Sequence, residues 1–174
     1  MLNSPFGEET VSTFSFYSHL PEASATLIVE DKGRIEGQWV ENSFQFANYP
    51  PSVAVKKADV RIEGSSRKGV RILVADNSGI QLRFPKVKQG SKMTLFYGVQ
   101  KKPTLQKVVY FYLQLYIGKK LIRRIRASSE EGWRREEFDL GVLSFLNHEV
   151  TMTFFATSDH PRNSSIVIVP EIEP

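Results

Sequence analysis

The run Val108-Val109-Tyr110-Phe111-Tyr112-Leu113-Gln114-Leu115-Tyr116-Ile117 alternates two kinds of side chain with a period of two. Its odd positions are all apolar, whereas its even positions from 110 onward are Tyr110, Tyr112, Gln114 and Tyr116. Successive side chains of a β-strand point to opposite faces of the sheet, so the run predicts a strand with an aliphatic face and a tyrosine-lined face. Because each residue of a strand rises about 3.3 Å, alternate side chains stand about 7 Å apart.

Strand-like segments of this kind recur along the whole chain, with turn residues between them at intervals of roughly 8–12 residues. The expected strands cover residues 13–19, 25–30, 37–40, 43–47, 52–63, 69–75, 79–84, 92–99, 107–117, 121–126, 134–140, 149–157 and 165–169. The segment Asp76-Asn77-Ser78-Gly79 lies between two alternating runs and predicts a hairpin. Helical patterning is scarce, and single turns are expected at Pro21–Ala25 and Leu140–Leu146. Many short strands indicate an all-β, antiparallel β-sandwich or barrel.

The composition is that of one globular domain over residues 1–174, in which residues 1–50 form an N-terminal flap or extra strands. Hydrophobic residues make up 41% of the chain and charged residues 24%. We expect no transmembrane segment, because no apolar run approaches the roughly 20 residues that a spanning helix needs. Met1-Leu2-Asn3-Ser4-Pro5 lacks the basic and apolar regions of a signal peptide. The absence of cysteine excludes disulfides and thiol chemistry.

A net charge of +4 permits contact with an anionic polymer without requiring one, and most of the excess is local. Lys119–Arg126 is rich in lysine and arginine and breaks the alternation, which indicates a bulge or a hairpin after Gly118. Acidic pairs at 130–131 and 136–137 could neutralise it by cross-strand pairing. Because no nucleic-acid motif is present, we favour a solvated, salt-bridged face and do not expect a nucleic-acid partner.

Catalysis finds little support in the sequence. The chain has three histidines, His19, His148 and His160, and none lies in a Gly-x-Ser-x-Gly or His-Glu-x-x-His context. A nucleophile needs a base within hydrogen-bond reach, and no pattern here indicates such a pair. We therefore expect no catalytic residues and no enzyme activity.

The second half of the chain carries a family resemblance. Its parts are Gly90–Val99, the Val108–Ile117 strand, Gly132-Trp133-Arg134-Arg135-Glu136-Glu137-Phe138-Asp139-Leu140-Gly141 and His148–Phe155. Together these segments resemble the galactose-binding-domain-like jelly rolls, which include many carbohydrate-binding modules. The resemblance covers residues 90–169 and implies a jelly-roll sandwich. It is specific for topology and poor for the ligand, because such domains bind sugars, lipids or proteins.

The family often carries a structural calcium ion held by loop carbonyls and carboxylates. Asp31, Asp76 and Asp159 are the acidic loop residues that could contribute, but no run matches a recognised calcium loop. We therefore expect no cofactor and no metal-binding residue, with a structural calcium as the less favoured alternative.

The tyrosine face is the leading candidate for a ligand site. Tyrosine rings can stack on the C–H faces of sugars, and Gln114 and Arg135 would hydrogen-bond the hydroxyls. The predicted ligand-binding residues are Tyr110, Tyr112, Gln114 and Tyr116, with Trp39 or Arg135 at the border of the platform. The alternative is that these tyrosines lie beneath the N-terminal segment as a second core layer. Trp133 is expected to pack at the edge of the sandwich.

The leading hypothesis is a non-catalytic binding module within a larger protein, with carbohydrate as the favoured ligand. The resemblance alone favours an extracytoplasmic or cell-surface location, and the chain itself gives no signal for one. The alternative is a structural or protein–protein interaction sandwich without a small ligand, which docks a neighbouring domain of the parent protein. That alternative predicts an exposed apolar patch or oligomerisation.

Overall fold

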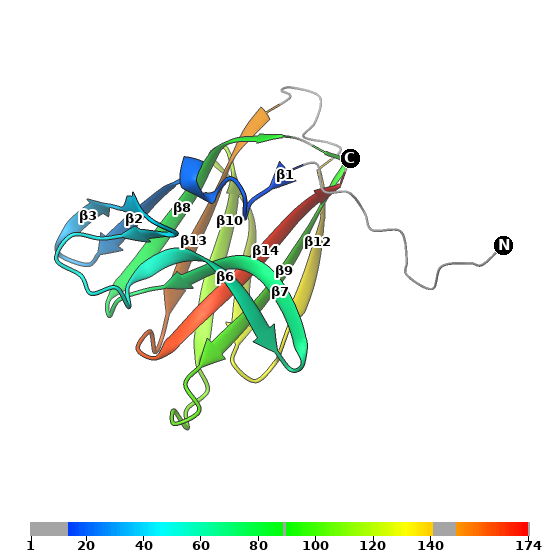
Figure 1. Ribbon diagram of the computed structural model, residues 1–174. Coiled ribbons are helices and arrows are strands. Elements are labelled where there is room, and N and C mark those ends of the chain that lie inside the picture. Colours follow the sequence, from blue (N-terminus) through cyan, green and yellow to red (C-terminus); the bar gives the residue numbers. More distant parts are fainter. Residues whose placement is uncertain (1–13, 89, 141–148, 174) are drawn as a thin grey trace.

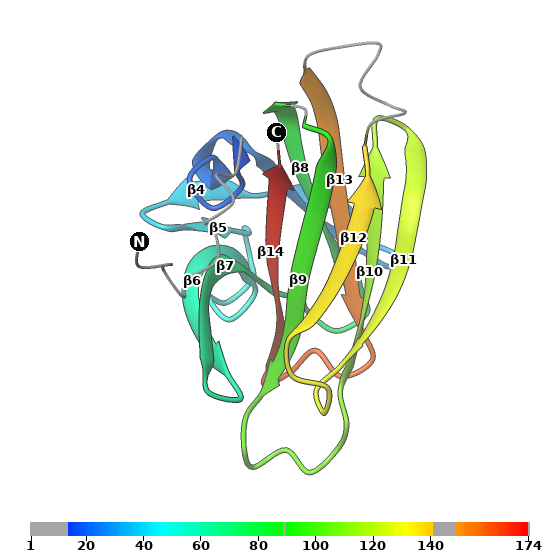
Figure 2. The ribbon, with the colours of Figure 1, turned by 90° about the vertical axis from the view of Figure 1, so that its right-hand side faces the viewer.

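A computed structural model describes residues 14–88, 90–140 and 149–173, which form two antiparallel sheets packed as a sandwich (Figures 1 and 2). In chain order the first elements are β1 (Phe14–Ser15), the 3₁₀ helix η1 (Leu20–Glu22), β2 (Ser24–Val29), β3 (Gly33–Glu36), β4 (Gln38–Val40), β5 (Ser43–Gln45), β6 (Ala54–Ile62) and β7 (Ser65–Leu73). The later elements are β8 (Ser78–Lys88), β9 (Lys92–Lys101), β10 (Tyr110–Ile117), β11 (Lys120–Ser128), β12 (Arg134–Asp139), β13 (Glu149–Ser158) and β14 (Ser164–Glu173). Within the described ranges no helix is long and apolar enough to cross a membrane.

The strand order identifies the type of sandwich. The eight-stranded sheet has the order β12-β9-β14-β7-β6-β5-β4, with β1 pairing to β14, and the six-stranded sheet has the order β11-β10-β13-β8-β2-β3. From β8 onward successive strands alternate between the two sheets, except at the β10–β11 hairpin. Such crossing between two antiparallel sheets is typical of a jelly roll. The predicted all-β, antiparallel jelly-roll sandwich is therefore confirmed.

The core lies between the two sheets. It is built from the side chains that point inward, which are every second residue along each strand. Phe16, Phe84 and Phe154 are fully buried and meet edge to face, with ring centroids 4.9 to 6.2 Å apart. Each such aromatic pair contributes about 0.5–1.5 kcal/mol beyond the area that it buries. On β10 the odd-numbered side chains from Phe111 to Leu115 are buried, as the alternation of this strand predicts.

The N-terminal third supplies strands to both sheets. β2 pairs with β8 and β3 in the six-stranded sheet, whereas β5 pairs with β6 and β4 in the other. β3 was not expected as a strand, because its mostly exposed residues show no apolar alternation. The strand expected at 13–19 shortens to β1, since the chain then turns into η1, which carries Pro21 in its first turn. The turn expected at Leu140–Leu146 lies outside the described residues from 141 onward.

The prediction of a hairpin at Asp76-Asn77-Ser78-Gly79 is wrong. The turn exists, with Asn77 at φ 52°, but β7 and β8 belong to different sheets, so the chain crosses the sandwich here. The tight hairpin lies earlier, between β6 and β7, where Glu63 and Gly64 both have positive φ. Turn chemistry identifies a reversal of the chain but does not identify the strands that it joins.

Candidate functional site

The tyrosine row lies on the outer face of β10, next to the edge strand of the six-stranded sheet. The Tyr112 side chain is 44% exposed, and Tyr110 and Tyr116 are half-buried. The described start of the chain does not lie on this sheet, because β1 pairs with β14 of the other one. Tyr112 is therefore part of an open surface and not of a second core layer.

The strand register surrounds Tyr112 with polar neighbours. Tyr112 lies opposite Arg126 of β11 and Thr157 of β13. The guanidinium of Arg126 lies 5.1 Å from the ring centroid of Tyr110, which is a cation–π distance. Further along the same face of β10, the Tyr116 hydroxyl donates a hydrogen bond of 2.7 Å to Oε1 of Gln114. These contacts orient the side chains on both sides of Tyr112.

Phe155 is a second aromatic residue of this face, which the sequence interpretation missed. It lies on β13 opposite Gln114 and is therefore a diagonal neighbour of Tyr112, at roughly 7–8 Å between Cα atoms. Its ring packs on Gly79, where an added Cβ would lie 2.5 Å from the ring Cζ. The missing side chain at Gly79 thus lets the ring lie against β8. The adjacent pair Phe154-Phe155 was the signal, because neighbouring strand residues point to opposite faces.

A hollow of about 580 Å³ opens beside Phe155 at the end of the six-stranded sheet. The residues that line it are Ile28, Glu30, Asp76, Asn77, Ser78, Gly79, Phe155, Thr157, Ser158, Asp159 and Pro161. The loop after β13 is tied to the tyrosine strand, because the Tyr110 N–H donates a 2.9 Å hydrogen bond to Oδ1 of Asp159. The volume falls within the range of about 300–1,000 Å³ that is usual for small-ligand sites.

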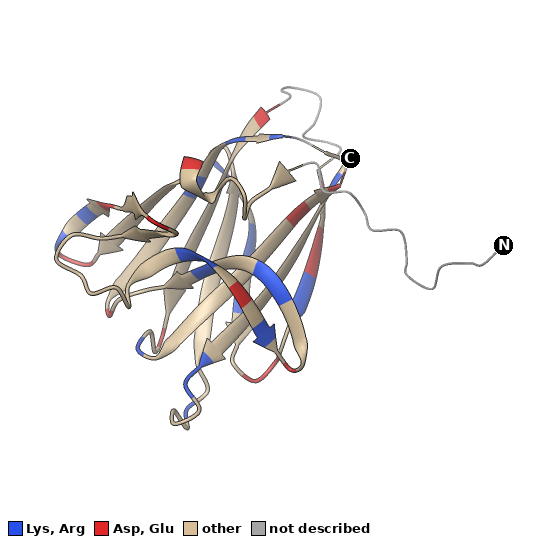
Figure 3. Ribbon diagram, viewed as in Figure 1, with Lys and Arg blue, Asp and Glu red and all other residues tan. Residues whose placement is uncertain are grey.

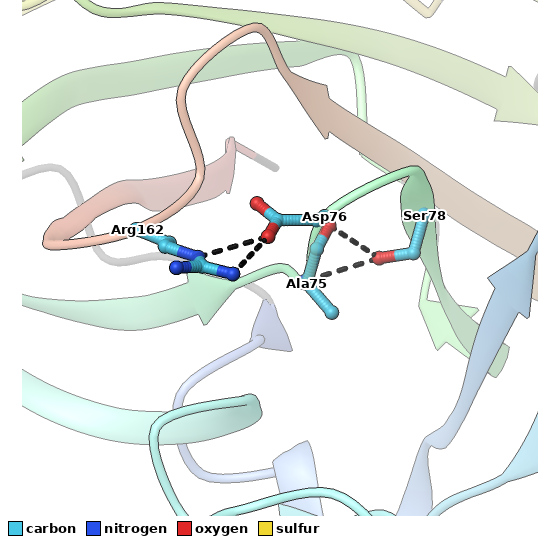
Figure 4. Close-up of polar contacts among 4 residues, drawn as sticks. All are labelled: Ala75, Asp76, Ser78 and Arg162. Atoms are coloured by element: carbon cyan, nitrogen blue, oxygen red, sulfur yellow. Dashed lines mark hydrogen bonds and ion pairs between the residues drawn. The ribbon is translucent and has the colours of Figure 1, made fainter.

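One wall of this hollow is fixed by an ion pair between two loops (Figure 4). The Arg162 guanidinium donates to Oδ2 of Asp76 from Nη2 at 2.8 Å and from Nε at 2.9 Å. The Ser78 hydroxyl accepts a hydrogen bond from the Ala75 N–H at 3.0 Å and donates one to the Ala75 carbonyl at 2.8 Å. The Ser78–Ala75 hydrogen bonds therefore stabilise the β7–β8 crossover internally, and the Asp76–Arg162 ion pair attaches it to the loop before β14.

Trp39 and Arg135 do not border the tyrosine platform. Both belong to the eight-stranded sheet, on β4 and β12, so the thickness of the sandwich separates them from the outer face of β10. Trp39 is half-buried and meets Phe44 edge to face at 5.0 Å. Arg135 pairs with Glu137. Of the predicted site residues, the structure brings together only those of β10. The alternation along one strand predicts which of its own residues share a face, but it does not predict which other strands lie beside them.

Trp133 packs against the eight-stranded sheet, as expected for a residue at the edge of the sandwich. It is half-buried beside Val60, Ile62 and Val167. Its indole N–H donates a 2.9 Å hydrogen bond to the carbonyl of Ser65. This hydrogen bond joins the segment before β12 to the start of β7.

The sequence predicted a bulge or a hairpin after Gly118, and β10 and β11 form a hairpin there with a register shift between Leu115 and Tyr116. Within Lys119–Arg126, Arg123 forms an ion pair with an acidic residue of the 136–137 pair, although not by pairing within one sheet. Arg123 lies 3.1 Å from Glu136, which joins the edge strands β11 and β12 of the two sheets. Arg134 lies 3.5 Å from Glu131. Since the arginines are more than half exposed, each pair contributes only about 0–1 kcal/mol.

The acidic loop residues considered for calcium do not form a cluster. Among the residues that the structure describes, no group of three or more histidine, aspartate or glutamate side chains could hold a metal ion. Asp31 lies in the β2–β3 turn at φ 65°, whereas Asp76 is bound by Arg162 and Asp159 by a backbone N–H.

No protein-family model matches the sequence, and no curated protein matches it. The structure of TmCBM61 in complex with β-1,4-galactotriose aligns with 95% of this chain and 97% of its own, with 10% identity and a TM-score of 0.45. A carbohydrate-binding module of the β-sandwich superfamily aligns with 95% of this chain and 62% of its own, at 10% identity and a TM-score of 0.45. A family 16 carbohydrate-binding module aligns with 66% of this chain and 81% of its own, at 12% identity and a TM-score of 0.30. All three alignments have TM-scores below 0.5 and identities of 10–12%.

Proposed function

We propose that this domain is a non-catalytic carbohydrate-binding module that holds a sugar ring against Tyr112 and Phe155. The observation that carries the proposal is the 44% exposed ring of Tyr112 on an open sheet face. Exposed aromatic rings are costly in water and stack well on the apolar C–H faces of pyranose rings. The exposed ring of Tyr112 and the half-buried ring of Phe155, on neighbouring strands, would together form the platform for one sugar.

The hollow beside the platform supplies the polar half of the site. Asn77 can both donate and accept hydrogen bonds through its amide, and Glu30 and Asp159 offer carboxylate oxygens to sugar hydroxyls. A sugar ring stacked on Phe155 would therefore direct its hydroxyls toward the loops 76–79 and 158–161. Stacking would supply affinity, and these directed hydrogen bonds would supply specificity.

Two of the three carboxylates that line the hollow, Asp76 and Asp159, already have structural partners, which favours binding over hydrolysis. A glycosidase needs two carboxylates that are free to act on opposite sides of a glycosidic bond. Here the Asp76 carboxylate is held by Arg162, and Oδ1 of Asp159 accepts the Tyr110 N–H. We therefore propose a binding role without catalysis.

The alternative of a protein-docking sandwich predicts a contiguous exposed apolar patch. Within the described residues the exposed large hydrophobic side chains are Val40, at 51%, and Tyr112, and they lie on different sheets. Carbohydrate binding is therefore the better proposal. A place in a larger, extracytoplasmic protein belongs to the same proposal and rests on the family resemblance.

The test is a glycan-array screen of the wild type, of Tyr112→Ala and of Val40→Ala as the matched control. We expect binding that falls about tenfold or more in Tyr112→Ala and is unchanged in Val40→Ala. Thermal unfolding should show that both variants remain folded. Equal binding by all three proteins would reject the tyrosine platform as the sugar site, and no binding across the array would favour the docking alternative.

A further inference from the structure

A second and larger hollow, of about 1040 Å³, lies on the side of the eight-stranded sheet. Its walls come from the 49–53 segment, the ends of β6 and β7, the end of β9 with its following loop, and the loop before β14. Asp76 and Pro161 line both hollows, so the Asp76–Arg162 ion pair lies between them. We call this second hollow the basic groove.

The charges that line the basic groove are almost all positive. Its charged residues are Arg61, Arg71, Lys101, Lys102, Arg162 and Asp76. Figure 3 shows lysine and arginine positions at the adjoining ends of β6 and β9. Asp76 and Arg162 neutralise each other, and the structure forms no ion pair with the other cations within the described residues. The groove therefore carries an uncompensated positive charge.

Arg71 lies in the most unfavourable electrostatic position of this set. It lies directly opposite Lys56 on β6, and like charges placed opposite each other destabilise a sheet. Its Nη2 donates a 2.7 Å hydrogen bond to Oε1 of Gln100, but its buried Nε has no hydrogen-bond partner. Burial lowers the pKa of the Arg71 guanidinium, and no carboxylate opposes this effect. An anion in the groove would supply the counter-charge that the Arg71 guanidinium lacks.

Hydrogen bonds to main-chain carbonyls hold the surroundings of Arg71 in place. Gln100, which accepts from Arg71, donates through Nε2 to the carbonyl of Arg61 at 3.2 Å. Lys101 Nζ donates to the carbonyl of Lys107 at 2.7 Å, which fixes the loop after β9. The remaining walls include the flat apolar surfaces of Tyr49 and Pro103. The groove thus combines a fixed guanidinium with surfaces on which a ring can lie.

We propose that the basic groove is a second saccharide site, in which Arg71 binds the carboxylate of a uronate residue. The planar guanidinium matches a carboxylate in geometry, and a charge-assisted hydrogen bond is about twice as strong as a neutral one. The preference for an anion rests on the groove alone. The choice of a saccharide as the carrier of that anion rests on the proposed function.

The test is a titration of the full chain by calorimetry with trigalacturonate and with its uncharged methyl ester. The two ligands share one sugar backbone and differ in that each carboxylate of the acid is an uncharged methyl ester in the other, so the affinity ratio, together with its salt dependence, measures the anion site. We expect the acid to bind about tenfold tighter than the ester at low salt, and the ratio to shrink at about 0.5 M salt. Equal affinities for the two ligands would overturn the proposal.

Variants separate the two sites. Arg71→Gln should abolish the preference for the acid, and exposed Lys102→Gln should weaken it, whereas Lys119→Gln, in the β10–β11 turn, removes the same charge and should leave it unchanged. Tyr112→Ala should retain the preference, so failure of the tyrosine platform is distinguishable from failure of the groove. Equal losses in Arg71→Gln and Lys119→Gln would show a general charge effect and overturn the proposal. Displacement of trigalacturonate by inorganic phosphate at equal concentration would overturn the saccharide as the ligand.

Discussion

The two outer faces of this sandwich differ in what lies on them. On the six-stranded sheet the outward side chains of β10 and β13 form an open surface that includes the exposed ring of Tyr112. On the eight-stranded sheet the long β6–β7 hairpin curves across β14 and β9, and its residues Val60 and Ile62 form a second apolar cluster with Val167. Outward-pointing side chains in a sheet are therefore exposed or buried according to the segment that folds over them.

Each outer face has a glycine on which a bulky side chain packs, and the two glycines illustrate the difference between a covered and an open face. On the covered face, an added Cβ at Gly98 would lie 2.5 Å from Cδ1 of Ile62 and 3.2 Å from Cε3 of Trp133. On the open face, an added Cβ at Gly79 would lie 2.5 Å from Cζ of Phe155. Ile62 is held within a cluster, whereas Phe155 has solvent on its outer side and can move.

Two alanine substitutions on β13 test whether its outer face is open, through their effects on the free energy of unfolding. Phe154→Ala removes a fully buried ring and should lower the free energy of unfolding by about 3–5 kcal/mol. Phe155→Ala should lower it by roughly 1 kcal/mol, because its ring is only half-buried. Urea denaturation of both variants measures the difference. Equal losses would mean that the outer face of β13 is covered in solution.

Alanine substitutions at Gly98 and Gly79 should also differ in how much they destabilise the protein, by a smaller amount than the two phenylalanine variants. Gly98→Ala should destabilise the protein by about 1–3 kcal/mol, since Ile62 and Trp133 must shift within a packed cluster. Gly79→Ala should have a weaker effect on stability, because the Phe155 ring can turn into solvent, yet it should weaken sugar binding. Denaturant melts and the glycan array check the two effects separately. A larger destabilisation at Gly79 than at Gly98 would contradict the assignment of open and covered faces.

Tyr97 of β9 gives the eight-stranded sheet a dependence on alkaline pH. Burial, and then the carboxylate of Glu136, raise the pKa of Tyr97 above its usual value of about 10. Above that pH the unfolded chain loses this proton before the folded chain does, so stability falls as pH rises toward the folded pKa. Tyr97→Phe should lose less stability than the wild type between about pH 9 and pH 11 in urea melts. All other groups are common to both proteins, so identical losses would show that the pKa of Tyr97 is not raised by folding.

The smallest expected effect concerns the edge strands, where the two sheets meet side by side. The ion pair between Arg123 and Glu136 is exposed at the arginine end, so its coupling free energy should be about 0.2–1 kcal/mol. A double-mutant cycle with Arg123→Gln and Glu136→Gln measures this coupling in urea at low and high salt. A coupling above this range would show that the edges, and not only the core, hold the sheets together.

The fold was predictable because its signals are local. The alternation of β10 decided which of its residues enter the core, and every buried residue of that strand lies on the predicted face. The same local signals failed at Asp76–Gly79, because a turn motif does not show whether the chain remains in one sheet. The covered or open state of the tyrosines could not be predicted either, since it depends on where a distant segment packs.

The proposed sites were predictable only in part, for the same reason. Tyr112 could be found because one strand places it between the other tyrosines. Phe155 reaches that face through the register of β13, and the groove around Arg71 is assembled from segments far apart in the sequence. Trp39 and Arg135 were assigned to the platform by residue type, and strand order places them on the opposite sheet.

The wall shared at Asp76 and Pro161 has a consequence for valency. If both proposed sites bind sugars, a single polymer that carries neutral and acidic sugars would be able to occupy the two hollows of one molecule at once. Release from one hollow then leaves the chain held by the other, at an effective concentration far above that in solution. The residence time on a long mixed polymer would thus exceed what either site achieves with a short ligand, without any additional contact.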